Sequence, residues 1–296
     1  MNEVAKNILI RAGIIDGDKN TLRVGILAAG GTQTGAFSGG VLYHMIDLGL
    51  SDKLDVAVGI SASAPNITHF LAKNKTAISV YWEDNIKGLI HPWHFWKAVD
   101  LDYLDSSFRK RTPSNIVSVM RNNPTEFYVG VTKVNGKGEL INVKEAKDIV
   151  DPIMASCSLP ILGGKPRNIN GELYLDGGIS LPLPVKEIAK KFSLTDLLVI
   201  INSTPEIFTE EHSLAEKIEA EYDLKNFGED FAKAFSGQKK VAEESLALTS
   251  TGVLPNGCRV AVISPTYNIS KICTDVKTLK EFSEEGKRIA KSFFSI

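Results

Sequence analysis

The stretch from Asp55 to Pro65 constrains the fold of this chain more than any other, because it reads as a buried strand that turns at a serine into a helix. Apolar residues dominate positions 56–60, and Gly59 stands two residues before Ser61. A serine on such a tight turn exposes its hydroxyl beyond the sheet, and the backbone N–H after it faces the place where an oxyanion would form. The pattern predicts that Ser61 is the nucleophile of an acyl transfer.

The tripeptide Gly-x-Ser is a weak signal by itself, since it occurs at Gly59-Ile60-Ser61 and again at Gly178-Ile179-Ser180. The context separates these two copies. The first follows an apolar run and precedes a helical pattern, whereas the second is followed by Pro182 and Pro184, which prevent a regular helix from starting there. The alternative for Ser61 is a plain helix N-cap, a common structural role of serine at such a position.

The composition is that of a globular protein, because 43% of the 296 residues are hydrophobic and the formal net charge is −1. A chain with 34 basic and 35 acidic residues has no basic excess with which to bind nucleic acid. The three cysteines, Cys157, Cys258 and Cys273, lack the spacing of a metal or redox site and are expected to be reduced thiols. No apolar run has the length of a signal peptide or a membrane span, so we expect a cytoplasmic protein in which any membrane contact is peripheral.

Further apolar runs predict the remaining strands of a sheet, at 23–29, 127–131, 140–143, 197–201 and 259–263. A glycine-rich turn at 135–138 joins the second and third of them. Helical patterns occur between and after the strands, at 36–48, 64–73, 144–156, 206–248 and 276–294. Strands that alternate with helices predict an α/β fold with a mostly parallel central sheet.

The expected domain organisation is simple. Residues 1–20 form a short N-terminal arm, and residues 21–296 form a single α/β domain. Residues 76–111 are a helical insertion in that domain, and its C-terminal part is helical at about 206–248 and 276–294.

The insertion at 76–111 concentrates aromatic residues, including Trp82, Trp93 and Trp96. Two interpretations stay open. The aromatic side chains pack a helical subdomain against the sheet, or they line an apolar pocket for an acyl chain.

The glycine-rich loop at 30–35 follows the first strand and precedes a helix, which is also the arrangement of a phosphate-binding turn. A dinucleotide-binding loop needs glycine at its third position, where this chain has Thr32. A nucleoside-triphosphate loop needs lysine followed by serine or threonine, where this chain has Ala36 and Phe37. The loop is therefore not expected to bind a nucleotide.

A serine nucleophile usually relies on a histidine base that an acid orients. The usual chain order of nucleophile, acid and histidine leaves His212 as the candidate base. This histidine lies in the charged stretch from Glu210 to Ser213, which is typical of a solvent-exposed helix. A triad through His212 therefore stays a weak alternative.

Three motifs together resemble the patatin-like phospholipase family of lipolytic acyl hydrolases. They are the glycine-rich loop after the first strand, the Gly-x-Ser turn about 30 residues later, and a downstream Asp-Gly-Gly that begins at Asp176. The runs from Ala155 to Pro160 and from Tyr174 to Gly178 match the family as well, so the resemblance covers about 23–185.

The resemblance implies a patatin-like three-layer α/β/α fold and a catalytic dyad in which Asp176 accepts the proton of Ser61. It also implies an oxyanion hole of backbone N–H groups, those of Gly30, Gly31, Thr32 and Ala62. The implied substrates are fatty-acyl esters, phospholipids among them, and neither a metal nor an organic cofactor is implied. The sequence does not indicate an oligomeric state.

Four residues around this dyad depart from the family pattern. Thr32 replaces the third glycine of the loop, and a β-branched residue resists the positive φ that glycine allows. Thr34 replaces a basic residue, Ser63 replaces the glycine that ends the nucleophile motif, and Leu181 replaces a usually polar residue. These changes leave a second hypothesis open, a lipid-binding or scaffold protein of the same fold with reduced or lost hydrolytic activity.

Overall fold

Buried apolar strands form the centre of the computed structural model, which describes residues 1–90, 99–112, 114–160, 163–210, 224 and 227–295. The strands β1 (Val24–Ala28), β2 (Val56–Ile60) and β7 (Asp196–Ile200) are buried along their whole length. A strand that is covered on both faces has no polar side to alternate with, which is why these runs are apolar apart from Asp196 at the start of β7.

The strands join in one sheet with the order β5-β6-β3-β2-β1-β7-β8, and β4 pairs with β3 outside this path. The pairs from β3 through β2, β1 and β7 to β8 are parallel, whereas β3–β4, β3–β6 and β5–β6 are antiparallel. The mostly parallel central sheet is therefore confirmed. The remaining strands are β8 (Arg259–Ile263), β3 (Glu126–Lys133), β4 (Gly138–Asn142), β6 (Glu172–Asp176) and β5 (Arg167–Ile169).

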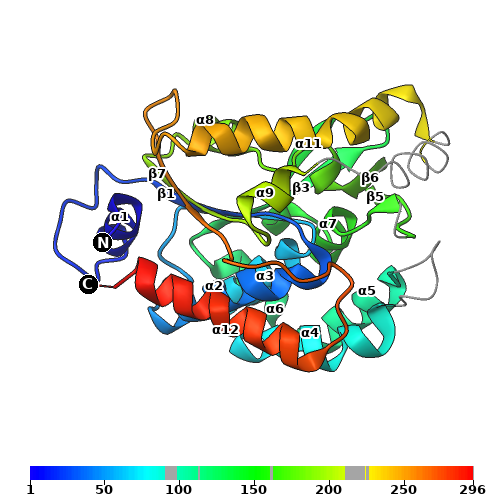
Figure 1. Ribbon diagram of the computed structural model, residues 1–296, viewed down its shortest axis with the longest axis horizontal. Helices are drawn as coiled ribbons and strands as arrows, with labels where there is room; N and C mark the ends of the chain where they lie inside the picture. The colour runs from blue at the N-terminus through cyan, green and yellow to red at the C-terminus, as the bar shows by residue number, and fades with distance from the viewer. Residues whose placement is uncertain (91–98, 113, 161–162, 211–223, 225–226, 296) are drawn as a thin grey trace.

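Helices cover both faces of this sheet, as the three-layer expectation requires (Figure 1). Successive side chains of β1 point to opposite faces, so that Ile26 and Ala28 join one hydrophobic cluster and Leu27 joins another. The helices of the first cluster include α2 (Gly35–Asp47), α3 (Ser63–Leu71), α7 (Val150–Ser156) and α12 (Val276–Phe293). The helices of the other face are α8 (Val185–Lys191) and α11 (Glu229–Thr249).

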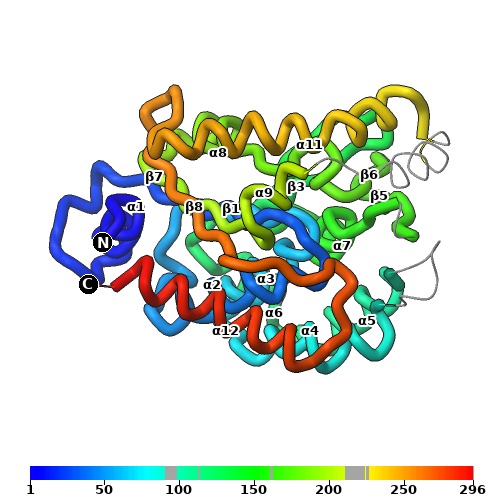
Figure 2. The backbone as a smooth tube through the Cα atoms, viewed as in Figure 1, coloured from blue at the N-terminus to red at the C-terminus, as the bar shows by residue number. Residues whose placement is uncertain are grey.

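The first helix, α1 (Glu3–Arg11), belongs to the same hydrophobic core as the sheet. Its residues Val4, Ile8 and Leu9 are at most 2% exposed. Figure 2 shows that the chain begins and ends on the same side of the molecule. The division into an arm at 1–20 and one domain at 21–296 stays a prediction.

The insertion at 76–111 is helical in its described parts, with α4 (Val80–Glu83), a π-helical turn η3 (Asn85–Leu89) and α5 (Leu101–Arg111). It is followed by α6 (Ile116–Asn122). Trp93 and Trp96 lie outside the described residues. None of the described helices is both long and apolar enough to cross a membrane.

One expected helix boundary is wrong. The helix predicted at 144–156 begins only at Val150, because two separate turns divide the segment. Asn142 accepts the backbone N–H of Lys144 and caps a short 3-10 turn, whereas Asp148, which precedes the N-cap residue Ile149 of α7, accepts the N–H of Val150. In the C-terminal region, α9 (Pro205–Thr209) and α11 flank a stretch at 211–223 that the description leaves out.

Candidate active site

Ser61 occupies a turn between β2 and α3 whose backbone few residues other than glycine adopt. Its φ angle is 52°, in the left-handed region that costs a non-glycine residue about 1–2 kcal/mol. Gly59 permits the close packing of the turn, since a Cβ there would lie 2.7 Å from the Cα of Ala64. The hydroxyl of Ser61 therefore projects from the carboxyl end of a central strand, as the strand–serine–helix pattern predicts.

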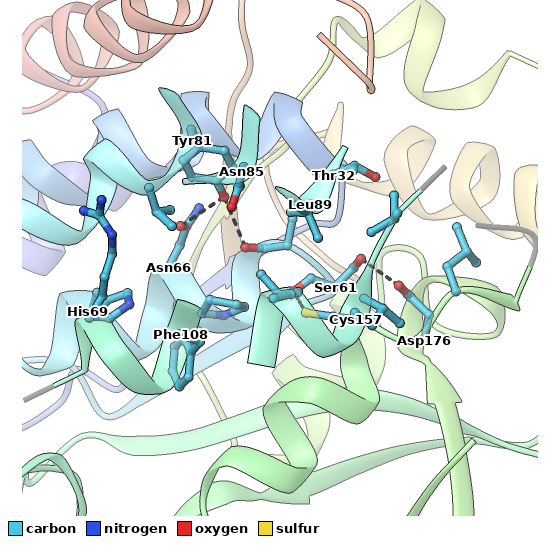
Figure 3. A pocket seen from close by; sticks show the side chains of 18 residues that line it. Thr32, Ser61, Asn66, His69, Tyr81, Asn85, Leu89, Phe108, Cys157 and Asp176 are labelled. Carbon is cyan, nitrogen blue, oxygen red and sulfur yellow. Dashed lines mark hydrogen bonds between the residues drawn. The ribbon is translucent and has the colours of Figure 1, made fainter. Parts of the chain in front are cut away.

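The register of the sheet brings Asp176 to Ser61 although 115 residues separate them. Ile60 pairs with Gly130 of β3, and the next residue of β3, Val131, pairs with Asp176 at the end of β6. Ser61 Oγ donates a hydrogen bond of 2.7 Å to Asp176 Oδ2. The structure thus places the two residues of the expected dyad in direct contact (Figure 3).

The carboxyl group of Asp176 lies in an environment that disfavours its charge. Asp176 is 2% exposed, and burial raises its pKa to about 7. The hydrogen bonds from the Ser61 hydroxyl and from the backbone N–H of Gly178 act in the opposite direction but more weakly. A carboxylate with a pKa near neutrality is a better base than one with an ordinary value near 4.

No histidine is bonded to Ser61 in the part of the chain that the structure describes. His69 lines the same cavity as Ser61, but burial lowers its pKa to about 4 and its Nδ1 atom lies 3.5 Å from Asn74 Nδ2. The alternative base His212 lies outside the described residues.

Ser156, the last residue of α7, and Cys157, which follows it, hold the backbone of Ser61. The Ser61 N–H donates to Ser156 Oγ at 2.9 Å, and Ser156 Oγ donates to Gly130 O at 2.7 Å. The Cys157 thiol donates to the carbonyl oxygen of Ser61 at 3.3 Å, and burial raises the pKa of this thiol. These contacts were not expected from the sequence, although Ser156 and Cys157 lie in a run that resembles the family.

The glycine-rich loop lies against Ser61. A Cβ at Gly30 would lie 2.9 Å from Ser61 Cβ, and Gly30, Gly31 and Thr32 line a cavity together with Ser61. Within the described ranges, the backbone N–H groups of these three residues and of Ala62 have no protein acceptor. These four N–H groups are therefore not engaged by the backbone in the described part of the chain.

The threonines of the loop have different backbone conformations. Thr32 has a φ angle of 51°, so a β-branched side chain adopts the left-handed conformation that glycine favours. Thr34 has a φ angle of −66°, and its hydroxyl donates to Gly31 O at 2.7 Å. The loop thus keeps a glycine-like turn at Thr32, and the hydrogen bond from Thr34 to Gly31 O stabilises it.

Ser63 is fully buried and hydrogen-bonded at the start of α3. Its hydroxyl donates to Ala29 O at 2.6 Å and lies 3.1 Å from Ser38 Oγ. Asn202, which follows β7, donates to the same Ala29 oxygen at 2.7 Å and accepts the backbone N–H of Ser38 at 3.0 Å. This polar network ties the glycine-rich loop to two helices and to β7.

Sequence reasoning missed Asn202. The available signal was a polar residue close behind a buried strand, because the carboxyl ends of parallel strands are where sites of α/β proteins form.

Two cavities meet at Ser61 and Asp176. The first, of about 780 Å³ including its opening to solvent, is mainly apolar, and half of its lining residues come from the insertion at 76–111 (Figure 3). Its aliphatic and aromatic lining includes Val80, Tyr81, Leu89, Val99, Leu101, Leu104 and Phe108. The second, of about 1330 Å³, lies between the glycine-rich loop, the helices α9 and α11 and the segment at 268–272. We call them the first and the second chamber.

The dyad contains no metal-binding arrangement. In the described segments no three histidine, cysteine or acidic side chains are grouped so that they could hold a metal ion.

The strand–serine–helix turn at Ser61, the buried Asp176 and the glycine-rich loop lie together on a three-layer fold, as in the patatin pattern. The sequence matches the family described as patatin-like phospholipase over residues 26–189, more than half of the chain. The protein therefore belongs to the patatin-like phospholipase family.

The sequence identity to individual relatives is low, and each match covers only part of the chain. The chain is 27% identical over 192 residues to the uncharacterized protein YjjU of Escherichia coli. The matched region covers 62% of this chain and 52% of the relative. It is 31% identical over 101 residues to the mouse protein named 1-acylglycerol-3-phosphate O-acyltransferase Pnpla3. The matched region covers 33% of this chain and 23% of that relative. This chain thus spans about half or less of the length of these curated relatives.

A solved structure shares the fold. VipD from Legionella pneumophila matches 92% of this chain and 66% of its own chain with a TM-score of 0.54 and 13% sequence identity. At this level of identity the likeness concerns the fold alone.

Proposed function

We propose that the protein is a serine acyl hydrolase that cleaves fatty-acyl esters with Ser61 as nucleophile and Asp176 as base. The observation that carries this proposal is the 2.7 Å hydrogen bond from Ser61 Oγ to a carboxyl oxygen that is almost completely buried. General-base catalysis needs this separation between the base and the proton that it removes.

The reaction follows from this contact. As Ser61 Oγ attacks the ester carbonyl carbon, its proton passes to Asp176 and the carbonyl oxygen becomes an oxyanion. The N–H groups of Gly30, Gly31, Thr32 and Ala62 bind that oxygen. The intermediate then expels the alcohol, which takes the proton from Asp176, and an acyl-Ser61 ester remains.

Water completes the cycle. Asp176 accepts a proton from the water that attacks the acyl-Ser61 ester, and the collapse of the second intermediate returns this proton to Ser61 Oγ. The products are a fatty acid and the free serine.

The chambers suggest the substrate class. The mainly apolar wall of the first chamber suits an acyl chain, and the larger second chamber leaves room for the alcohol part of the ester. Phospholipids and lysophospholipids fit this division. We expect such a substrate to be taken from a membrane surface by peripheral contact, at a cytoplasmic location.

A fluorophosphonate probe tests the proposal directly, since it labels an activated serine. We expect labelling of the wild type that Ser61→Ala abolishes, together with hydrolysis of short and long acyl esters. Ser180→Ala is the matched control, because Ser180 stands in the other Gly-x-Ser and its hydroxyl lies 2.8 Å from Thr132 Oγ1. Asp176→Asn is expected to abolish turnover while the fold persists.

Three results would redirect or contradict the assignment. An absence of both labelling and esterase activity would favour the second hypothesis, a lipid-binding or scaffold protein. Transfer of the acyl group to an added lysophospholipid, in preference to water, would indicate an acyltransferase like the activity for which the mouse relative is named. Retained activity in Asp176→Asn would contradict the dyad.

A further inference from the structure

A further cavity lies behind one end of the first chamber, and we call it the rear cavity. It has a volume of about 290 Å³ including its opening to solvent and lies among α2, α3 and the 3-10 turn η2 (Lys75–Ser79). Its lining is mainly apolar and includes Leu42, Ile46, Phe70, Ala77 and Ile78. The protein thus has a second apolar space next to the chamber that contains Ser61.

The wall between the first chamber and the rear cavity consists of two residues of α3. Among the described lining residues, only Asn66 and His69 belong to both spaces. Asn66 is fixed by three hydrogen bonds, since its Nδ2 donates to Gly35 O at 2.8 Å and to Ser38 Oγ at 3.0 Å, and its Oδ1 accepts from the Tyr81 hydroxyl at 3.1 Å. Asn66 is therefore a structural part of this wall.

His69, in contrast, is held mainly by packing. The centroid of its ring lies 5.2 Å from that of Phe108, and its one polar contact among the described residues is the 3.5 Å approach of Nδ1 to Asn74 Nδ2. The residue is 8% exposed, and burial lowers its pKa to about 4 with a smaller contribution from Arg111. The imidazole is thus neutral at neutral pH and closes the wall without a charge.

Arg111 also lines the first chamber, but its positive charge is balanced. Its Nη2 atom lies 2.8 Å from Glu83 Oε2, its Nε atom donates to Asp84 Oδ2, and its Nη1 atom donates to Ser79 Oγ at 2.8 Å. An alkyl chain that reaches His69 therefore meets no unbalanced cation there.

An acyl chain that starts at Ser61 runs towards this wall. Figure 3 shows Ser61 and Asp176 at one end of the first chamber and His69 at the other. We propose that His69 sets the longest acyl chain that the first chamber accepts, because its imidazole closes the chamber off from the rear cavity. This inference rests on the proposed function, which takes the acyl chain to extend from Ser61.

The expected consequence is a limit on chain length. Each methylene group that leaves water for an apolar site strengthens binding about fourfold. A chain that ends before His69 gains this amount with every added carbon, whereas a longer chain cannot bury its last carbons without displacing the imidazole. The affinity should therefore stop rising at the length that reaches His69.

Equilibrium binding of free fatty acids tests this limit without a chemical step. Saturated, unbranched acids of increasing length would be titrated as monomers into the Ser61→Ala protein. We expect the affinity to rise about fourfold with each added methylene and then to reach a plateau at one length. Adding His69→Ala should open the rear cavity, so that the rise continues to longer acids and the longest bind at least about fourfold more tightly than to Ser61→Ala alone.

Two further variants distinguish access to the rear cavity from a general loosening of the chamber. Leu104→Ala also removes a large side chain from the first chamber, but Leu104 does not line the rear cavity, so the plateau should stay at the same length. Ile78 lines the rear cavity and not the first chamber. Ile78→Phe fills part of that space, so adding it to His69→Ala should return the plateau towards its original length.

The inference is overturned if the affinity of Ser61→Ala keeps rising with chain length, which would mean that the chain leaves the chamber by another route. It is also overturned if His69→Ala leaves the plateau unchanged, or if Leu104→Ala moves it equally far. If His69→Ala does not fold, His69→Phe decides, because the larger ring should move the plateau to shorter acids and an unchanged plateau would refute the proposal. A protein that shows the plateau and its shift but hydrolyses no ester would contradict only the proposed function.

Discussion

The backbone N–H of Ser61 donates a 2.9 Å hydrogen bond to Ser156 Oγ, which ties the turn between β2 and α3 to the end of α7. The same hydroxyl donates to Gly130 O on the neighbouring strand. Ser61 has a left-handed backbone with a φ angle of 52°, so a contact from outside the turn helps to hold the conformation that aims its hydroxyl at Asp176.

Ser156→Ala should lower kcat about tenfold and leave KM nearly unchanged, because Ser156 lines neither chamber and one lost hydrogen bond corresponds to about 1–1.5 kcal/mol. Steady-state kinetics with one ester would measure this split. Ser158→Ala is the control, since the Ser158 hydroxyl donates to Met154 O at 2.9 Å and, among the described residues, forms no hydrogen bond with the turn. Equal losses of kcat in the two variants would show that Ser156 acts only through the stability of the fold.

The rate should depend on pH through Asp176. Burial raises the pKa of this group to about 7, and only the deprotonated carboxylate can accept the Ser61 proton. We therefore expect kcat/KM to rise with pH, with a midpoint near 7, and to level off above it. A profile that is flat through the neutral range would contradict the assignment of Asp176 as base.

Stability should depend on pH in the opposite direction. The pKa of Asp176 is about 7 in the folded protein against 3.8 for an unperturbed aspartate, so the unfolded chain releases this proton at lower pH. The contribution of Asp176 to stability is thus highest below about 4 and falls as the pH rises to about 7. Asp176→Asn should exceed the wild type in stability at alkaline pH, by at most about 4 kcal/mol, and the gap should close in acid. Thermal denaturation at several pH values measures the gap, and a constant gap would refute this explanation.

Replacing Thr32 by glycine should maintain or raise stability. The relief of a left-handed threonine is worth about 1–2 kcal/mol and exceeds the entropic cost of glycine in the unfolded chain, about 0.4–1 kcal/mol. Thr34→Gly is the matched comparison and should be destabilising, because Thr34 has an ordinary φ angle and donates to Gly31 O. Urea denaturation of both variants would decide, and equal losses would show that the backbone of Thr32 is not strained.

Gly59→Ala should displace the nucleophile turn, since the new Cβ would lie within 2.9 Å of three backbone atoms of Ser63 and Ala64. We expect a loss of several kcal/mol in stability and of probe labelling at Ser61. Gly237→Ala in α11 is the control, because a Cβ there meets nothing within 4 Å and alanine favours a helix by about 0.5–1 kcal/mol. Normal labelling of Gly59→Ala would contradict the need for close packing at this turn.

Much of the fold was predictable because the signals are local. The apolar runs of β1, β2 and β7 and the helical pattern of α12 identify their own secondary structure, and Gly59 before Ser61 identifies the turn. The late start of α7 was not predicted. The residue at which a helix begins depends on small differences in free energy between neighbouring turns, and a local pattern does not resolve them.

The sequence by itself determined that Ser61 stands on a strand-to-helix turn, because that information lies within about ten neighbouring residues. Only the tertiary structure decided what surrounds it. The contact with Asp176 depends on strand register across β2, β3 and β6, the brace from Ser156 depends on the packing of α7, and the raised pKa of Asp176 depends on burial. Register, packing and burial join residues that are far apart in the chain, so no local pattern encodes them.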